Sequence, residues 1–114
     1  MGEKTLCWIP TYRHRQWQPA VDVYRAPDGW LVKCDLAGVR REDIQVSLAD
    51  RRLTISGARR DWALTCDYHV YSLEIAYACF ERTIELPYVL EGAEVRVDYR
   101  DGMLLISLTT DRNT

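Results

Sequence analysis

The sequence is poor in the residues that most enzymes and metal sites require. Its 114 residues include only two histidines, His14 and His69, and neither has a neighbour at a metal-ligand or catalytic-triad spacing. None of the four cysteines forms a C-x-x-C pair, which argues against the usual zinc and thioredoxin-like motifs. We therefore expect no catalytic residues, no cofactor and no metal site, and a protein that is not an enzyme.

Long apolar runs and an excess of basic charge are absent as well. No segment is apolar enough to cross a bilayer, and Met1 to Pro10 is too short and too polar for a signal peptide. We therefore expect no membrane partner and a cytoplasmic location, where the cysteines should be free thiols. The net charge is −2 and the arginine pairs lie near acids, so we interpret the pairs as solvated surface and expect no nucleic-acid partner. These pairs are Arg40–Arg41, Arg51–Arg52 and Arg59–Arg60.

The sequence does contain a sustained alternation of apolar and polar residues with period two, which is typical of strands. No long segment carries a clean helical period. Turn residues separate the alternating segments, and Asp101–Gly102 is the strongest hairpin signal because glycine tolerates a positive φ. Seven or so short strands with regular turns predict an all-β fold, an antiparallel sandwich. The segments are residues 21–24, 30–36, 44–48, 53–56, 80–86, 95–99 and 104–108.

One connection, residues 58–76, is far longer than a usual hairpin loop and rich in apolar side chains. Within it Cys66, Tyr68 and Val70 alternate with their neighbours, which predicts a further strand. If this strand pairs with the sheet edge of another subunit, the connection is a dimerisation arm. The alternative is a local hairpin folded back on its own sandwich.

Arg82 is the one charged residue that draws attention by its position. It shares a strand face with Phe80, Ile84 and Leu86, and a charge on such a face requires a carboxylate or carbonyl groups as partners. The alternative is an arginine whose stem packs at a strand edge while its head stays in water.

The order and spacing of these segments resemble the α-crystallin domain of small heat-shock proteins, of the bacterial and plant type. No motif is specific alone, but together they cover residues 17 to 108, nearly the whole chain. The final one, Val97 to Leu104, is similar to the family's A-x-x-x-N-G-V-L signature. The others are Trp17–Tyr24, Asp35–Val39, Arg41–Ile44, Leu53–Gly57, Phe80–Arg82 and Leu86–Pro87.

This resemblance implies an immunoglobulin-like sandwich of seven to eight strands with a long, strand-bearing dimerisation loop. In bacterial and plant members that loop swaps into the partner subunit, so the implied partner is a second copy of the chain. The resemblance also places an interface arginine at Arg82. The implied dimer interface comprises Cys66, Tyr68, Val70, Tyr71 and Arg82, with Val21 and Val23 on the strand that receives the arm.

The resemblance further implies a client or peptide groove between two strands, lined by Val46, Leu48, Val95 and Val97. The alternative is that these four are ordinary core residues. A second candidate client surface is an N-terminal arm, because aromatic residues on an arm can bury area against many shapes. Its residues are Leu6, Trp8, Ile9 and Trp17, which could also pack on their own sandwich.

Some positions depart from the family pattern. Ala37 replaces the proline of the D-L-P-G motif, and residues 109–114 lack the apolar I-x-I segment that joins dimers into large assemblies. We therefore expect a homodimer or a small oligomer. The expected division is an arm at residues 1–16, an α-crystallin-like domain at 17–109 and a polar tail at 110–114.

The function that the resemblance implies is an ATP-independent molecular chaperone, a holdase that binds partly unfolded client proteins and prevents their aggregation in the stress response. The alternative is a partner-specific co-chaperone or adaptor domain of the same sandwich fold. Suppression of aggregation for several unrelated clients favours the first, and dependence on one cellular partner favours the second.

Overall fold

The computed structural model describes residues 17–61, 69–87 and 92–110 of the chain. These residues form no α-helix, only a single 3-10 turn, η2 (Arg41–Asp43), and seven strands. The period-two segments therefore form strands as the sequence predicts. The strands are β1 (Val21–Ala26), β2 (Gly29–Asp35), β3 (Ile44–Ala49), β4 (Arg52–Ala58), β5 (Cys79–Glu85), β6 (Glu94–Arg100) and β7 (Met103–Thr109).

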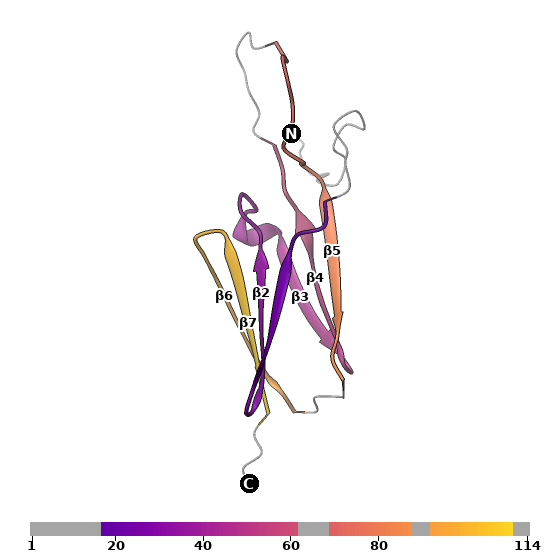
Figure 1. The fold of residues 1–114 in the computed structure, drawn as a ribbon, viewed down its shortest axis with the longest axis vertical. Helices are drawn as coiled ribbons and strands as arrows, with labels where there is room; N and C mark the ends of the chain where they lie inside the picture. The colour runs from indigo at the N-terminus through magenta and orange to yellow at the C-terminus, as the bar shows by residue number, and fades with distance from the viewer. Residues whose placement is uncertain (1–16, 62–68, 88–91, 111–114) are drawn as a thin grey trace.

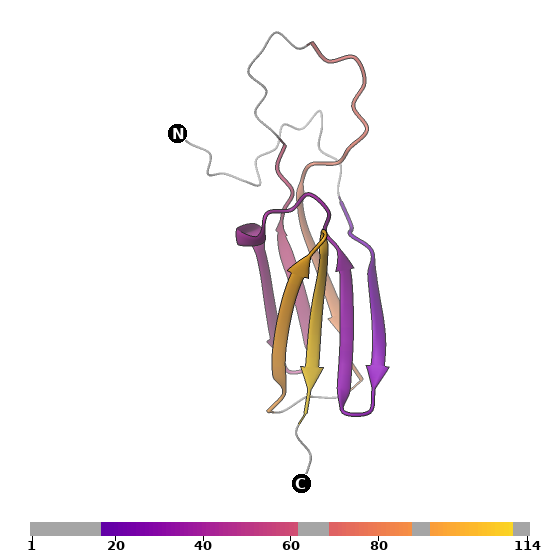
Figure 2. The ribbon, with the colours of Figure 1, turned by 90° about the vertical axis from the view of Figure 1, so that its left-hand side faces the viewer.

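The strands form two sheets that pack face to face (Figures 1 and 2). One sheet has the order β1-β2-β7-β6 and the other the order β3-β4-β5, with every neighbouring pair antiparallel. The predicted all-β antiparallel sandwich is thus confirmed. Four strands are left at sheet edges, β1 and β6 in the first sheet and β3 and β5 in the second.

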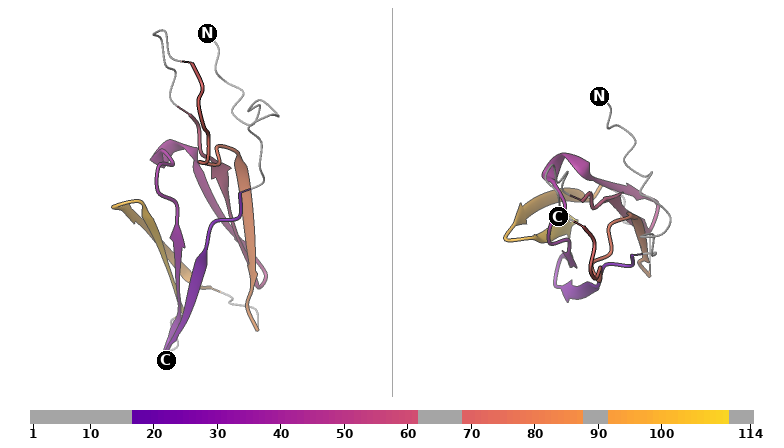
Figure 3. Two further views of the ribbon diagram at one scale, coloured as in Figure 1. Left: turned by 45° about the horizontal axis from the view of Figure 1, so that its top comes forward. Right: turned by 90° about the horizontal axis from the view of Figure 1, so that it is seen from above.

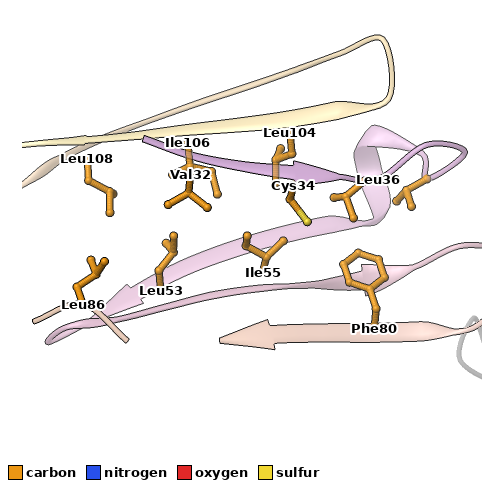
Figure 4. Close-up of a cluster of buried hydrophobic side chains, with 11 residues drawn as sticks. Val32, Cys34, Leu36, Leu53, Ile55, Phe80, Leu86, Leu104, Ile106 and Leu108 are labelled. Atoms are coloured by element: carbon orange, nitrogen blue, oxygen red, sulfur yellow. The ribbon is translucent and has the colours of Figure 1, made fainter. Parts of the chain in front are cut away.

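The core lies between the sheets because alternate residues of each strand face inward. On β7 these are Leu104, Ile106 and Leu108, which are at most 1% exposed, and Leu53 and Ile55 of β4 face them from the other sheet (Figure 4). Fully burying a side chain of this size contributes about 1.5–3 kcal/mol. Inward apolar residues on both sheets therefore supply the main stabilisation of the sandwich.

The turn between β6 and β7 follows the hairpin prediction. Arg100 pairs with Met103, which leaves a two-residue turn in which Asp101 and Gly102 have φ angles of 54° and 77°. Positive φ at both positions is the requirement of a type I′ turn, which matches the right-handed twist of the flanking strands. This turn fixes the register of β6 on β7, and so decides which residues of β6 face inward.

The segment that follows β2 is held against the end of β6 by Tyr99. The Tyr99 hydroxyl lies 2.8 Å from the carbonyl oxygen of Leu36 and 2.6 Å from that of Val39, and donates its proton to this pair. Burial raises the pKa of Tyr99, so the hydroxyl keeps the proton that both contacts need. Arg41 of η2 adds a bond from Nη2 to the Tyr99 carbonyl oxygen at 2.9 Å.

The described part of the long connection projects beyond one end of the sandwich (Figures 1, 2 and 3). Residues 69–78 form no strand in the single chain. Val70 is 72% exposed and Tyr71 is 99% exposed, so the described part does not fold back onto its own sandwich. The first part of the predicted strand, with Cys66 and Tyr68, lies outside the described residues.

The two described cysteines differ from each other. Cys34 is a fully buried free thiol on β2, and burial raises its pKa from 9.0 to about 11. Cys79, at the start of β5, is disulfide-bonded, and its partner lies outside the described residues. The expectation of free thiols is therefore wrong for Cys79, because spacing along a sequence does not reveal which cysteines the fold brings together.

Candidate binding surfaces

The predicted groove residues lie on the edge strands β6 and β3, which are on the same side of the sandwich (Figure 2). On β6, Val95 pairs with Leu108 and Val97 pairs with Ile106, so both valines share the inward face of the sheet. Leu108 and Ile106 are completely buried, whereas Val95 is 39% and Val97 is 50% exposed. The inner face of β6 is therefore an apolar surface that the rest of the described chain does not cover.

The two groove residues on β3 are more deeply placed. Val46 pairs with Ile55 and Leu48 with Leu53, so both point toward the core and pack against it while remaining half-buried. The structure thus places all four predicted groove residues on inward faces at one open side of the sandwich. Val46 and Leu48 also contribute to the core, whereas the two valines of β6 remain exposed.

Backbone groups at this side are oriented by the strand registers. The Leu36 amide donates to the Gly102 carbonyl. Even-numbered residues of β7 therefore direct their backbone N–H and C=O groups toward β2, and odd-numbered residues direct theirs toward β6. Because antiparallel pairing alternates, Val95 and Val97 then direct their N–H and C=O groups to the free edge of β6. The bond from the Leu86 amide to the Arg51 carbonyl fixes the same alternation in the second sheet. Through the register of β4 on β3, it directs the backbone groups of Val46 and Leu48 to the free edge of β3. Apolar side chains beside outward backbone groups can accept an extended peptide as an added strand.

The opposite side of the sandwich, between β1 and β5, is tied by Arg82. Its side chain shares the inward face with Phe80 and Ile84, as the alternation predicts, and Nη1 donates to the Pro19 carbonyl oxygen at 2.6 Å. Among the described residues no carboxylate forms an ion pair with Arg82. Of the two kinds of partner expected, the carbonyl is the one that the structure shows. On β1, Val21 packs against the core and Val23 is 44% exposed.

Trp17, predicted as part of a client-binding arm, packs on its own sandwich instead. Its ring meets Phe80 edge to face with centroids 5.2 Å apart, and the Arg59 guanidinium lies 3.8 Å from its centroid. The other residues predicted for the N-terminal arm, Leu6, Trp8 and Ile9, lie outside the described residues. For Trp17 the structure shows the alternative of packing on its own sandwich, within the domain expected at residues 17–109.

Arg59 holds together two segments that are distant in the sequence, a role that the sequence does not reveal. Nε and Nη2 donate to the Ala76 carbonyl oxygen at 2.9 and 2.7 Å, and Nη1 donates to the Ala37 carbonyl oxygen at 3.1 Å. Burial lowers the pKa of Arg59 because it desolvates the charged guanidinium, and the three bonds to carbonyl oxygens offset part of this cost. Arg59 thereby fixes the point at which the exposed connection leaves the sandwich.

The interpretation of the arginine pairs as solvated surface is wrong for Arg59–Arg60. Arg59 is half-buried, and Arg60 Nη2 lies 2.7 Å from Asp43 Oδ1, whose side chain is only 8% exposed. Arg51 and Arg52 are exposed beside Glu85, as expected. The two pairs differ because of tertiary contacts: the long connection and the η2 segment pack against Arg59–Arg60 but not against Arg51–Arg52. Charge patterning along the chain cannot show such contacts.

The exposed side chains of the connection form a second apolar surface. Tyr71 and Val70 are the most exposed, and Leu73 and Ile75 are 49% and 59% exposed. We call residues 69–75 the arm. Single exposed apolar residues are common, but several along one projecting segment are typical of an interaction surface.

No group of three potential metal ligands occurs in the described parts of the chain. No helix in those parts is long and apolar enough to cross a membrane.

A two-sheet sandwich of this strand order, with a long connection before β5, defines the α-crystallin type of domain. The Hsp20/alpha crystallin family model matches residues 22–114, and the chain belongs to this family. It is 31% identical over 103 residues, 87% of the chain, to spore protein SP21 of Stigmatella aurantiaca, and 31% identical over 93 residues, 79% of the chain, to heat shock protein 16 of Schizosaccharomyces pombe. It spans 61% and 64% of the lengths of these two relatives.

Solved structures agree with this assignment. Heat shock protein 16.0 of Schizosaccharomyces pombe superposes with a TM-score of 0.77 at 26% identity, covering 87% of this chain and 92% of that one. A small heat-shock protein of Xylella fastidiosa gives a TM-score of 0.71 at 27% identity, covering 88% and 92%. The family is non-enzymatic, and chaperone activity is what membership of it implies.

Proposed function

We propose that the protein is an ATP-independent holdase that binds extended segments of partly unfolded proteins in the groove between β3 and β6. The observation that carries this proposal is the exposure of Val95 and Val97, whose paired neighbours on β7 are completely buried. Non-native proteins expose apolar side chains and unpaired backbone groups, and this groove offers both kinds of partner. Family membership supports the same activity.

The test is suppression of light scattering during thermal aggregation of three unrelated client proteins. A holdase suppresses scattering for all three at near-stoichiometric ratios, without ATP. A partner-specific co-chaperone or adaptor, the alternative function for this sandwich, suppresses none of them. An unrelated protein that remains folded at the assay temperature, added at the same mass concentration, controls for crowding.

We also propose that the working unit is a homodimer in which the arm and residues 66–68 pair along β1 of the partner, near Val21 and Val23. The exposed side chains of the arm support this pairing. β1 is an edge strand, and the bond from the Asp35 amide to the Ala20 carbonyl sets Val21 and Val23 with their backbone groups toward the free edge. The arm could therefore add to β1 as a further strand.

Deletion of residues 62–73 should convert the dimer into a monomer. The measurement is solution mass by multi-angle light scattering at micromolar concentration. A matched variant, Tyr71→Ser with Val70→Ser, keeps the chain length and should weaken the dimer without changing the circular dichroism spectrum. A deletion variant that stays dimeric contradicts the arm exchange.

We place the protein in the cytoplasm, a location that its family membership supports. Fractionation of lysed cells, with the protein followed by immunoblot, tests this location. Recovery of most of the protein with membranes or in the medium contradicts it.

A further inference from the structure

The outer face of β6 carries a pattern that the groove itself does not use. Glu94, Arg96, Asp98 and Arg100 alternate in sign along this edge strand. Arg96 Nε lies 3.6 Å from Glu94 Oε2 and Arg100 Nε lies 3.3 Å from Asp98 Oδ2, with all four side chains largely exposed. The other edge of the groove differs, because the outward residues of β3 are uncharged: Gln45, Ser47 and Ala49.

A segment that binds along β6 must therefore place its own side chains opposite this charge pattern. Two of its apolar residues that lie opposite Val95 and Val97 point into the groove. The residue between them points outward and lies opposite Arg96, because directly paired residues share a face. This holds for both strand directions, since the middle residue stays in the middle. The residues on either side of the apolar pair lie opposite Glu94 and Asp98.

The length of the site is limited by η2. Arg41 Nη2 occupies the outward carbonyl of Tyr99, and the Arg41 guanidinium lies 5.6 Å from the Tyr99 ring centroid. The available edge is therefore centred on Val95 and Val97, which a segment of five residues spans.

We propose that this edge selects extended segments with the pattern basic–apolar–acidic–apolar–basic, and that Arg96 sets the preference for an acidic residue at the middle position. The inference rests on the proposed groove and adds the chemical class of its ligand. Opposite charges directly across two strands favour pairing, and like charges oppose it, by about 1.5- to 5-fold in affinity for each pair. Three such pairs act together here. Because the charges are exposed, salt weakens the preference.

The experiment measures fluorescence anisotropy of labelled peptides titrated with the full chain. The probes are Lys-Ile-Glu-Ile-Lys, its charge-reversed form Glu-Ile-Lys-Ile-Glu, and the scrambled Lys-Glu-Ile-Ile-Lys, which keeps composition and net charge but loses the alternation. The first should bind about tenfold more tightly than the second, and more tightly than the third. Half-molar salt should reduce the difference between the first two.

Variants assign the preference to Arg96. Arg96→Glu turns one of the three favourable pairs into an unfavourable one, so it should reduce the preference for the first peptide from about tenfold to about twofold. Arg52→Glu, which makes the same charge change at an exposed, ion-paired position of the other sheet, should preserve it. Equal binding of the first two peptides, or an equal response to both variants, overturns the inference while leaving the groove intact. If none of the peptides binds, the proposed groove itself fails. If the chain alone self-associates through this edge and Arg96→Glu prevents it, a second copy is the occupant and the inference is overturned.

Discussion

Strands β6 and β7 are paired residue for residue and carry the same alternation of apolar and polar side chains, yet they end in opposite environments. Ile106 and Leu108 of β7 are completely buried, while Val97 and Val95, directly opposite them on the same face, are half exposed. The difference follows from position in the sheet. β7 is flanked on both sides by strands, whereas β6 is an edge strand. Period two therefore predicts which way a residue faces, and the topology decides whether anything covers it.

This contrast predicts that truncating an inward residue lowers the free energy of unfolding much more on β7 than on β6. Ile106→Ala leaves a cavity in a packed core and should lower the free energy of unfolding by about 2–5 kcal/mol. Val97→Ala removes side-chain atoms that are already half in water, so it should cost less than about 1 kcal/mol. Urea unfolding of both variants provides the measurement. Similar losses for the two would show that the groove is closed by contacts within the chain.

The opposite side of the sandwich, between β1 and β5, differs from the groove because a hydrogen bond from Arg82 to Pro19 joins its two sheets. Arg82→Met keeps an apolar stem but leaves the Pro19 carbonyl without its donor, which should cost about 1–3 kcal/mol. Arg52→Met removes an exposed ion pair with Glu85 and should cost less than about 1 kcal/mol. Thermal unfolding compares the two variants. Equal and small shifts in Tm would mean that Arg82 makes no bond of consequence in the single chain.

The stability of the interior strand β2 should depend on pH, because the thiol of Cys34 is buried there. Burial raises its pKa to about 11 in the folded state from an ordinary value of 9.0. Below pH 9 the thiol is protonated in both states. Between pH 9 and 11 the unfolded chain loses the proton first, so stability falls as pH rises through this window. Cys34→Ala should show a shallower decline in the urea midpoint over that range. An identical pH dependence in wild type and variant contradicts a raised thiol pKa.

Much of the fold could be predicted from the sequence because strand alternation and turn chemistry are local. The Asp101–Gly102 hairpin, the inward face of β7 and the position of Arg82 beside Phe80 all follow from spacing of two and from glycine's freedom at positive φ. The position of the groove residues on inward faces follows from the same rule.

The remaining features depend on contacts between segments that are distant in the sequence. Arg59 binds Ala37 and Ala76, and Trp17 packs against Phe80, and neither pairing leaves a periodic signal in the chain. The same is true of Cys79, whose disulfide depends on proximity in space. For the arm, an alternating pattern predicts a strand, but residues 69–78 form no strand in the single chain, although four sheet edges are free there. A strand needs a second strand, and sequence alone does not show which molecule provides it.

The central claim is that the uncovered inner face of β6 is where non-native chains bind. The most direct test compares suppression of client aggregation by the wild type and by the double variant Val95→Thr with Val97→Thr, which keeps branched side chains of similar shape but adds hydroxyls. An unchanged urea midpoint and solution mass serve as controls for folding and assembly. We predict that the variant needs a several-fold higher ratio to client for the same suppression of light scattering. Equal suppression by the two proteins would contradict the claim.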